Sequence, residues 1–468
     1  MILVLLKKYK IYFIDVILPI PIQKTFTYSI NEEEYNFLKE GMRVAVSFGK
    51  SKIYTALVYK IHNNEPKLYE AKEIHQILDE FPIVNKIQLK YWQWIAEYYM
   101  CALGDVYRAS LPSAFLLESE TIIYKNESFT DESVLIDEEF LIFEALQHQS
   151  QLTINQIVDI LDRKKVMPIV NSLLKKSAIY IKEEIYETYK PKLVKYVKLH
   201  SDYNADDSLN SLLEELSRAK KQREAILTYF QLSTSKKPIK AKELETKSNV
   251  SSAILNSLVD KNILEFYHLK TDRIHFKGDT NSLKKLNEFQ EKALIEIKDA
   301  FLQKDVTLLH GITSSGKTEV YTKLIQEVLE KGQQVLFLLP EIALTTQIIT
   351  RLQAYFGKQI SVFHSKYSMN ERVEVWNNVL ENKSKAQIIL GVRSSLFLPF
   401  SNLGLIVVDE EHETSYKQFE PNPRYNARDA AIVLAKMHQA KILLGSATPS
   451  LESYFNAKQN KYGFVELN

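Results

Sequence analysis

The sequence predicts a multidomain α/β protein with a small β-rich N-terminal domain, a helical middle region and a C-terminal α/β nucleotide-binding layer. Length is the first reason, because 468 residues correspond to roughly three domains. Composition is the second, because 45% hydrophobic residues can build several cores. Patterning is the third: over residues 281–468, short apolar runs alternate with helical stretches, which is typical of a parallel sheet buried on both faces.

Charge and cysteine content exclude several classes of protein. The chain has 60 Lys and Arg against 58 Asp and Glu, so nucleic-acid contact requires local patches. The single cysteine, Cys101, rules out an internal disulfide framework and a multi-cysteine metal site, and indicates a reducing, cytoplasmic setting. The first residues, MILVLL, are too short to span a membrane and precede their lysines, unlike a secretory signal. We therefore expect no membrane partner.

The N-terminal domain is expected over residues 11–112. The runs YFIDVILPI and RVAVSFG have the composition of strands, and GKSKIYTALVYKI follows a turn at Gly49. The segment IQLKYWQWIAEYYMCAL has apolar residues at helical spacing, which predicts one helix. Residues 113–138 are rich in Glu, Asp and Ser and lack periodicity, so we expect a linker there.

Two middle segments, residues 139–190 and 222–268, show the same order of three helices and an extended tail. This order, with Asn171-Ser-Leu-Leu in one third helix and Asn256-Ser-Leu-Val in the other, predicts two winged-helix units, the second less regular. Third helices of this type can contact DNA, but neither is clearly basic, so a spacer or protein-contact role remains equally open. In the first unit we expect one apolar helix face to lie in the core, because its residues fall at helical spacing: Val166, Ile169, Val170, Leu173 and Leu174.

A phosphate-binding loop is predicted by GITSSGKT, which matches G-x-x-x-x-G-K-[ST] between an apolar strand and an amphipathic helix. Backbone N–H groups and the helix N-terminus would surround the β-phosphate. Lys317 would neutralise the β- and γ-phosphates, and the Thr318 hydroxyl would bind Mg²⁺, which predicts ATP and Mg²⁺ as ligands. The ATP-binding residues expected here are Gly311, Ile312, Thr313, Ser314, Ser315, Gly316, Lys317 and Thr318.

Two further motifs complete a hydrolytic site. In LIVVDEEH, a buried strand delivers Asp409 to the edge where α/β sheets bind ligands. Asp409 would hold the magnesium through water, and Glu410 would position and deprotonate the attacking water, so the catalytic set is Lys317, Asp409 and Glu410. The motif GSATPS then places Ser446 and Thr448 at a strand end beside the phosphates.

In this order the motifs resemble those of superfamily 2 helicases, and over residues 286–455 they resemble the PriA family of bacterial replication-restart helicases (primosomal protein N′). The matching segments are LNEFQ, LLPEIALTTQ, FHSKYS, GVRSSLFLPF, DEEHETSYKQ, RYNARDAA and GSATPSLES. The resemblance implies one RecA-like lobe over residues 281–468, with Gln290 contacting adenine. It implies that His412, Ser446 and Thr448 couple hydrolysis to movement.

The same resemblance implies a set of DNA contacts. After DEEH the family has an aromatic-rich loop that links DNA contact to ATP hydrolysis, and aromatic rings with cations suit stacked bases and phosphates. Near the N-terminus, ILPIPIQKTFTYSI, RVAVSFGK and LGDVYRASLP resemble the family's domain that captures a 3′ DNA end. Thr27 stands where the family often has Asp, although Thr can still hydrogen bond a 3′-hydroxyl. The expected DNA-binding residues are Phe26, Gly49, Lys72, Arg393, Tyr416, Lys417, Phe419, Arg424 and Tyr425.

Two departures from the family stand out. Family P-loops have Gly where this chain has Ser314, which costs about 1 kcal/mol if the position needs a positive φ. The family also continues with a second RecA-like lobe carrying arginine fingers, two zinc sites built from eight cysteines and a C-terminal domain. Because this chain stops at Asn468 with one cysteine, we expect an N-terminal fragment in which the second lobe is absent and no zinc is bound.

The resemblance implies an ATP-dependent 3′→5′ DNA helicase that recognises stalled forks and initiates primosome assembly. Its partners would be branched DNA forks, 3′ DNA ends, primosome proteins, single-strand-binding protein and the replicative helicase loader. For this chain we expect nucleotide and DNA binding with little unwinding. One alternative is a non-catalytic branched-DNA-binding module with a vestigial P-loop. Another is an ATP-sensing transcription regulator, against which the coupling motif counts.

Overall fold

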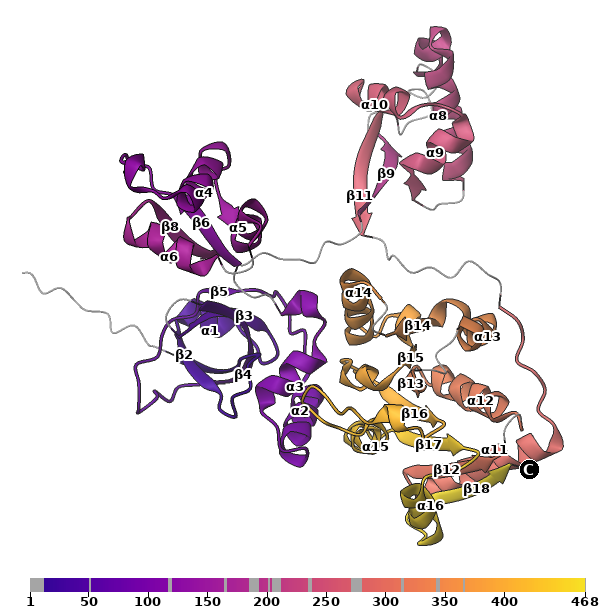
Figure 1. The fold of residues 1–468 in the computed structure, drawn as a ribbon. Coiled ribbons are helices and arrows are strands. Elements are labelled where there is room, and N and C mark those ends of the chain that lie inside the picture. The colour runs from indigo at the N-terminus through magenta and orange to yellow at the C-terminus, as the bar shows by residue number, and fades with distance from the viewer. Residues whose placement is uncertain are drawn as a thin grey trace, which may run out of the picture. The chain divides into compact units, whose positions relative to one another are not determined.

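The computed structural model describes residues 12–49, 52–116, 120–163, 166–184, 193–200, 203, 212–234, 238–270, 280–312, 315–341, 346–364 and 367–467 (Figure 1). The chain forms two compact units. One consists of residues 1–189 together with 276–468, and the other of residues 190–275. The fold class expected from the sequence, a β-rich domain, winged helices and one α/β lobe, is confirmed.

The N-terminal domain is built on a five-stranded antiparallel sheet of order β2-β1-β4-β3-β5. Alternating side chains of β1 and its neighbours fill one core, which includes Ile14, Val16, Val44 and Val58. The short helix α1 begins at an Asn31 cap that accepts the backbone N–H of the third helical residue. The elements are β1 (Tyr12–Ile17), β2 (Phe26–Ile30), α1 (Glu32–Phe37), β3 (Arg43–Phe48), β4 (Lys52–His62) and β5 (Gln76–Ile77).

The helical stretch that ends this domain is two helices, not the single one expected. They are α2 (Lys86–Tyr98) and α3 (Leu103–Ser110), followed by the 3₁₀ turn η1 (Ser113–Phe115). Met100 has φ +50°, a left-handed conformation that ends a helix. Gly104 lets α3 approach the backbone near β1, because a Cβ there would lie 2.0 Å from the Ile20 carbonyl oxygen.

The first winged-helix unit begins earlier than expected. Residues 113–138, predicted as a linker, contain η1, the strand β6 and the turn η2, because β6 pairs with the distant β8 in a sheet of order β7-β6-β8. The predicted core is confirmed: Val166, Ile169, Val170 and Leu173 are buried and Leu174 packs against them. The elements are β6 (Glu120–Lys125), η2 (Glu132–Val134), α4 (Asp137–His148), β7 (Leu152–Thr153), α5 (Ile154–Leu161), α6 (Met167–Lys175) and β8 (Ile179–Glu184).

The second winged-helix unit also starts upstream of its expected boundary at residue 222. Its central strand, β9, lies between β10 and β11 and closes the core over the three helices. The elements are β9 (Leu193–Leu199), η4 (Leu216–Arg218), α8 (Lys220–Ser233), β10 (Ile239–Lys240), α9 (Ala241–Ser248), α10 (Ser252–Asp260) and β11 (Leu264–Lys270). Within the described residues, both units combine three α-helices with a three-stranded sheet. The internal repeat predicted the three helices and an extended tail, but not the other strands.

The C-terminal lobe has a seven-stranded sheet of order β14-β15-β13-β16-β17-β12-β18, in which every pairing is parallel. Helices α11, α12 and α13 pack against one face, while α15 contacts β16 and β17 on the other (Figure 1). The edge strand β18 was not expected. The strands and main helices are α11 (Glu288–Gln303), β12 (Val306–Gly311), α12 (Lys317–Glu330), β13 (Gln334–Leu338), α13 (Thr346–Phe356), β14 (Ile360–Phe363), α14 (Met369–Leu380), β15 (Ile388–Gly391), β16 (Leu403–Asp409), α15 (Ala427–His438), β17 (Lys441–Ser446), α16 (Leu451–Lys458) and β18 (Gly463–Leu467). Short 3₁₀ turns η5 (Gly357–Gln359), η6 (Ser384–Ala386), η7 (Arg393–Phe397) and η8 (Thr414–Tyr416) connect them.

Helix α2 and the segments beside it join the N-terminal domain to this lobe. The Asn85 side chain donates to the Phe400 carbonyl at 2.8 Å, and Gln88 donates to the carbonyl of Phe397. From the lobe, the Trp376 indole donates to the Ile83 carbonyl at 2.9 Å. Because Gln88 and Trp376 are buried, these bonds satisfy groups that would otherwise be costly to bury.

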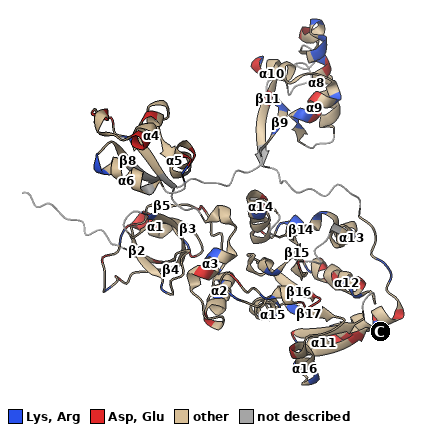
Figure 2. Cartoon of the chain, in the orientation of Figure 1, with Lys and Arg blue, Asp and Glu red and all other residues tan. Residues whose placement is uncertain are grey.

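Figure 2 shows Lys and Arg interspersed with Asp and Glu over the helices, while the strands of the seven-stranded sheet carry few charges. This distribution agrees with a net charge of +2 and with a sheet buried on both faces. Among the described residues, no helix has the length and apolar character needed to cross a bilayer.

A buried ion pair makes the N-terminal domain sensitive to one substitution. Arg43 contacts Asp79 through two nitrogens and donates to the Phe115 carbonyl at 2.9 Å, with the side chains only 4% and 7% exposed. Asp79→Ala leaves this guanidinium without its counter-ion, so we expect the domain to lose about 3–5 kcal/mol of stability. Thermal unfolding of the variant measures this. Glu138→Ala, which removes an exposed pair with Arg163, should change stability by less than about 1 kcal/mol.

Candidate nucleotide site and DNA-end pocket

The predicted phosphate loop lies between β12 and α12. Gly316, at the start of α12, has φ +87°, and a Cβ there would lie 2.2 Å from the Gln290 amide nitrogen, so only glycine fits. At the other end, a Cβ on Gly311 would approach the Ser315 hydroxyl at 3.0 Å. Thr313 and Ser314 lie outside the described residues. The loop thus has the strand–loop–helix context that the motif requires.

Lys317 is buried at the first position of α12. Its Nζ donates to the Gly311 carbonyl at 2.8 Å and lies 3.4 Å from that of Ile312. The same Nζ is 4.0 Å from Glu410 Oε1, so the ammonium has a carboxylate partner across the site. The half-buried Thr318 follows it on the helix.

Two side chains of the loop and its neighbour bear on whether a nucleotide fits. Ser315 Oγ is buried and, among the described residues, has no hydrogen-bond partner, so it can serve a bound phosphate. Gln290 is buried near the start of α11, where its oxygen accepts the Asn287 N–H at 3.1 Å and its nitrogen donates to the Ser315 carbonyl at 3.3 Å. The structure therefore places Gln290 directly against the phosphate loop.

The acidic motif follows β16. Asp409 Oδ1 accepts the Tyr321 hydroxyl at 3.0 Å, and burial together with the Glu410 charge raises the pKa of Asp409 to about 6. Glu410 has φ +48°, a left-handed conformation that is uncommon for a non-glycine residue and costs roughly 1–3 kcal/mol. Such strain persists only where the surrounding structure fixes it, and here it turns the Glu410 carboxylate toward Lys317.

The three residues predicted to couple hydrolysis to movement lie together. His412 Nδ1 is 2.8 Å from Ser446 Oγ, and His412 Nε2 is 3.4 Å from Thr448 Oγ1. Ser446 Oγ also accepts the Thr448 N–H at 3.0 Å, which leaves its own proton for the imidazole. A consistent arrangement has Nδ1 as acceptor and Nε2–H as donor. The parallel pairing of β16 with β17 brings these two motifs to one sheet edge.

Glu411 is a buried residue of this region that the motif analysis missed. Its carboxylate accepts the Ser450 N–H at 2.7 Å, the Ser450 hydroxyl at 2.9 Å and the Ser453 hydroxyl at 2.9 Å. Arg428 of α15 lies 3.2 Å away as its counter-ion. A second Glu between Glu410 and His412, with Ser450 and Ser453 at the start of α16, was the only available sequence signal. These bonds join the acidic motif to α15 and α16.

The aromatic-rich loop, residues 416–426, departs from expectation at two rings. Tyr416 is buried, with its hydroxyl 2.7 Å from the Asp409 carbonyl oxygen and 3.1 Å from that of Leu338. Tyr425 is also buried and packs edge-on against Phe397. Neither ring is presented for base stacking, because tertiary packing of the lobe encloses both. They hold the loop in place.

Other residues of this loop remain accessible. Phe419 is 69% exposed, and Arg424 is exposed with Glu420 3.3 Å away. Lys417 donates to the Arg424 carbonyl at 2.5 Å and lies 5.6 Å from the centre of the Tyr99 ring. One ring and two cations at the surface suit an unpaired strand.

Arg393 is held by protein groups. It donates to the Ser415 carbonyl at 3.0 Å and pairs with Glu341 at 3.6 Å. We expected it to contact DNA, and in this structure its partners are a carboxylate and a backbone carbonyl. The hydrogen bond from Arg393 to the Ser415 carbonyl also fixes the backbone just before Tyr416.

Tyr99, at the end of α2, also contacts the loop and was not predicted. Its hydroxyl accepts the Asn426 N–H at 3.2 Å and lies 3.4 Å from the Asn426 carbonyl oxygen. The N-terminal domain therefore touches the backbone of the aromatic-rich loop directly. The sequence predicts only a helix here, because nothing in a single segment indicates a contact with residues more than 300 positions away.

The three residues expected to hold a 3′ end line one cavity of about 400 Å³. Lys72 Nζ donates to the Gly49 carbonyl at 3.3 Å, and the Phe26 ring meets Phe48 edge-on at 4.7 Å. Tyr69 contributes another aromatic wall. The walls are mostly apolar, and the rim carries one cation, Lys72, and one carboxylate, Glu70. An aromatic wall beside a cation suits a base with its phosphate.

Backbone and hydrogen bonds define the polar part of this cavity. Gly49 has φ +74°, and a Cβ there would meet no atom within 4 Å, so conformation rather than crowding calls for glycine. Thr27 Oγ1 donates to Asp15 Oδ1 at 2.7 Å, and the Thr27 N–H donates to the Tyr69 hydroxyl at 3.0 Å. The Thr27 oxygen therefore faces a ligand only as an acceptor.

The winged-helix units show little cationic character on their third helices. The segment Ser252–Asp260 contains no Lys or Arg, and Met167–Lys175 contains one. Phosphate contacts by such helices depend on Lys and Arg. The composition therefore favours the spacer or protein-contact alternative over DNA contact through these helices.

The chain resembles known proteins along most of its length. Family models match residues 15–112 as a 3′DNA-binding domain (3′BD), 120–184 as a winged helix domain, 194–271 as the winged helix domain of PriA helicase of Bacteroidota, and 287–456 as a DEAD/DEAH box helicase. The replication restart protein PriA of Bacillus subtilis is 30% identical over 95% of this chain and 54% of its own length. That of Haemophilus influenzae is 31% identical over 97% of this chain and 52% of its own length. That of Rickettsia prowazekii is 49% identical over 40% of this chain and 28% of its own length.

The lobe and its motifs thus define a P-loop helicase lobe of the DEAD/DEAH box class. With its N-terminal domain and winged helices, the chain belongs to the replication restart protein PriA family. It spans about half the length of the curated relatives it matches.

The position of Lys317 gives a direct test of the nucleotide site. Lys317→Ala removes the cation that faces the loop carbonyls and Glu410, so we expect at least a tenfold loss of affinity for a fluorescent ATP analogue with Mg²⁺. Fluorescence anisotropy measures it. Lys323→Ala, a cation further along α12, serves as the matched control and should retain normal affinity. Equal affinity of the Lys317 variant and the parent chain would contradict this assignment.

Proposed function

We propose that this protein belongs to an ATP-driven 3′→5′ DNA helicase that recognises stalled forks and initiates primosome assembly. The observation that carries the proposal is that one sheet edge brings together the Lys317–Glu410 ion pair, Asp409 and the hydrogen-bonded His412–Ser446–Thr448 group. Binding modules that do not hydrolyse ATP have no need of such coupling. The cavity of the N-terminal domain lined by Phe26, Gly49 and Lys72, called the DNA-end pocket here, would give specificity for 3′ DNA ends.

In this proposal the phosphate loop and Lys317 bind the β- and γ-phosphates, and Gln290 lies where an adenine ring would sit against the loop. Thr318 and Asp409 would hold Mg²⁺, which when bound neutralises the charge that develops on the phosphates. Burial favours a neutral Asp409, since it raises the pKa to about 6, and a nearby cation reverses that preference. Glu410 orients the attacking water and takes its proton.

Two contacts would transmit a conformational change from the nucleotide site to the GSATPS motif and to the aromatic-rich loop. The imidazole of His412 joins the acidic motif to Ser446 and Thr448, so a shift at one strand end moves the other. The Tyr416 hydroxyl, which contacts the Asp409 carbonyl, links the aromatic-rich loop to the same strand end. Phe419, Lys417 and Arg424 would then contact the unpaired strand.

The DNA-end pocket would receive the terminal nucleotide of a 3′ end. Phe26 stacks on the base, Lys72 attracts the phosphate and Gly49 lets the backbone approach. The partners we infer are branched DNA forks, 3′ ends, primosome proteins, single-strand-binding protein and the replicative helicase loader, in the cytoplasm.

A second candidate, a non-catalytic branched-DNA-binding module, is favoured by one observation. The DNA-end pocket uses residues of the N-terminal domain alone and none of the phosphate loop. The Lys317→Ala chain separates the two functions. If its fork affinity and its phenotype in cells equal those of the parent, the module is the better description.

The isolated 468-residue chain should bind ATP but turn it over slowly. Its described residues contain one RecA-like lobe, and arginines supplied by a facing lobe contribute of the order of 10³-fold or more to such reactions. A coupled-enzyme assay with fork DNA measures turnover. DNA-stimulated hydrolysis of many ATP per second by this chain would overturn the expectation.

The pocket predicts a preference for the chemistry of a 3′ end. We expect the chain to bind a 3′-hydroxyl single strand at least several-fold more tightly than the same strand with a 3′-phosphate, because Lys72 can serve one phosphate while a second would lie between apolar walls and the Glu70 carboxylate. Phe26→Ala should remove most of that preference, since stacking contributes about 1–3 kcal/mol. Phe81→Ala, an exposed phenylalanine outside the pocket, is the control. Equal binding of both ends by the parent chain would argue against the pocket.

A further inference from the structure

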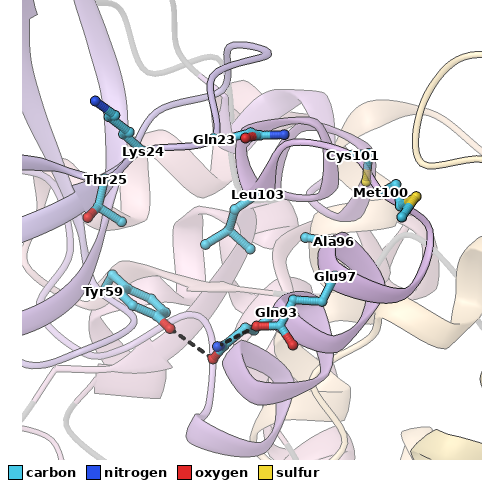
Figure 3. A pocket seen from close by; sticks show the side chains of 10 residues that line it. All are labelled: Gln23, Lys24, Thr25, Tyr59, Gln93, Ala96, Glu97, Met100, Cys101 and Leu103. Atoms are coloured by element: carbon cyan, nitrogen blue, oxygen red, sulfur yellow. Dashed lines mark hydrogen bonds between the residues drawn. The ribbon is translucent and has the colours of Figure 1, made fainter.

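A second and larger cavity, of about 850 Å³, lies in the N-terminal domain beside the DNA-end pocket. Figure 3 shows its walls: residues 23–25, which lead into β2, face Tyr59 of β4 and the side chains of α2 and α3. No motif in the sequence pointed to it. Its volume exceeds the roughly 400 Å³ of the first pocket, so it has room for a base with part of its backbone.

The two cavities are lined by consecutive residues of the chain. Residues 23–25, which precede β2, line the larger cavity, and residues 26–28 of β2 line the DNA-end pocket. Three residues span at most about 10 Å, which is about three nucleotides at the helical rise of 3.4 Å and fewer for a stretched strand. A strand whose last nucleotide occupies the DNA-end pocket therefore reaches the larger cavity with a nucleotide one to three positions upstream.

On one wall of the larger cavity, two hydrogen bonds fix the orientation of the Gln93 side-chain amide. The Tyr59 hydroxyl donates to Gln93 Oε1 at 3.0 Å, and Gln93 Nε2 donates to Glu97 Oε1 at 2.8 Å (Figure 3). The orientation of the Gln93 amide is thus assigned by its two partners. Each of its atoms keeps one further hydrogen-bonding capacity, an acceptor on Oε1 and a donor on Nε2. An amide with one acceptor and one donor available side by side matches the edge of a base.

The remaining walls suit the other parts of a nucleotide. Met100, Leu103 and Ala96 give an apolar surface, and Met100 is 90% exposed at the rim. A flexible thioether adapts well to a ring face. Lys24 is the cation opposite Glu97 (Figure 3). Because Glu97 repels phosphate, the strand must place its backbone on the Lys24 side and its base toward Gln93.

We propose that this cavity is a second nucleotide subsite, which takes the base of an unpaired nucleotide upstream of the 3′-terminal one. The proposal rests on the 3′-end binding proposed above. Gln93 contacts the edge of the base, the apolar wall contacts its face and Lys24 contacts its phosphate. The domain then reads a short length of single strand rather than a terminal nucleotide alone, which distinguishes an unpaired 3′ tail from a blunt end.

The test uses the 468-residue chain and a fluorescein-labelled thymidine hexamer with a free 3′-hydroxyl. Abasic sites replace the second, third and fourth nucleotides from the 3′ end, one at a time. In the parent chain one of these positions should lower affinity about fivefold or more, as expected for one lost base contact. In Gln93→Leu and in Met100→Ala, the unmodified hexamer should bind more weakly and that position should lose most of its effect.

Matched variants separate this proposal from the one on which it rests. Lys60→Gln changes an exposed cation on β4 outside the cavity and should behave as the parent chain. Phe26→Ala should weaken binding to every hexamer, and normal binding by that variant would contradict the DNA-end pocket itself. If Phe26→Ala weakens binding but no abasic position depends on Gln93 or Met100, the second subsite is wrong. Because Gln93 and Met100 are exposed, neither substitution threatens folding.

Discussion

The buried carboxylate of Glu411 is the constraint on which the nucleotide site depends. A charge in the interior persists only if its neighbours supply a counter-ion and donors. Here Arg428 and the start of α16 supply them, so the strand end that carries Asp409 and Glu410 is fixed to α15 and α16 before any ligand arrives. The position of the acidic motif therefore depends on the counter-ion and the hydrogen-bond donors that the buried Glu411 carboxylate requires. The same bonds position the loop after β17, which brings the coupling residues into reach of one another.

A second network extends this arrangement to the N-terminal domain. Tyr416 connects the strand end to the aromatic-rich loop, and Tyr99 connects the end of that loop to α2. Helix α2 in turn contributes Gln93 and Glu97 to the larger cavity, the one proposed as a second nucleotide subsite. A continuous series of packed groups thus joins the nucleotide site, the loop and the end-binding domain. Each contact uses a backbone group on one side, so the connection depends on shape more than on side-chain identity.

Much of the lobe could be predicted because its strands are continuous apolar runs and its loops carry fixed spacings. The phosphate loop, the acidic motif and the GSATPS segment each lie where β12, β16 and β17 end. Features that depend on partners distant in sequence could not be predicted. Strand β6 pairs with β8 and β18 pairs with β12, and neither short segment has a strong pattern of its own. An aromatic residue in a loop is typical of a stacking residue, and its burial depends on neighbours distant in sequence, which is why the enclosure of Tyr416 and Tyr425 could not be predicted.

The left-handed backbone at Glu410 has a consequence for how this chain balances its free energy. A glycine would adopt that conformation at no steric cost, and would give a more stable but chemically empty site. The chain instead keeps a carboxylate there, 4.0 Å from the Lys317 ammonium, and accepts a less stable backbone conformation. The backbone conformation that holds the Glu410 carboxylate in the site therefore lowers the stability of the folded lobe. The packing of the rest of the lobe offsets that loss of stability.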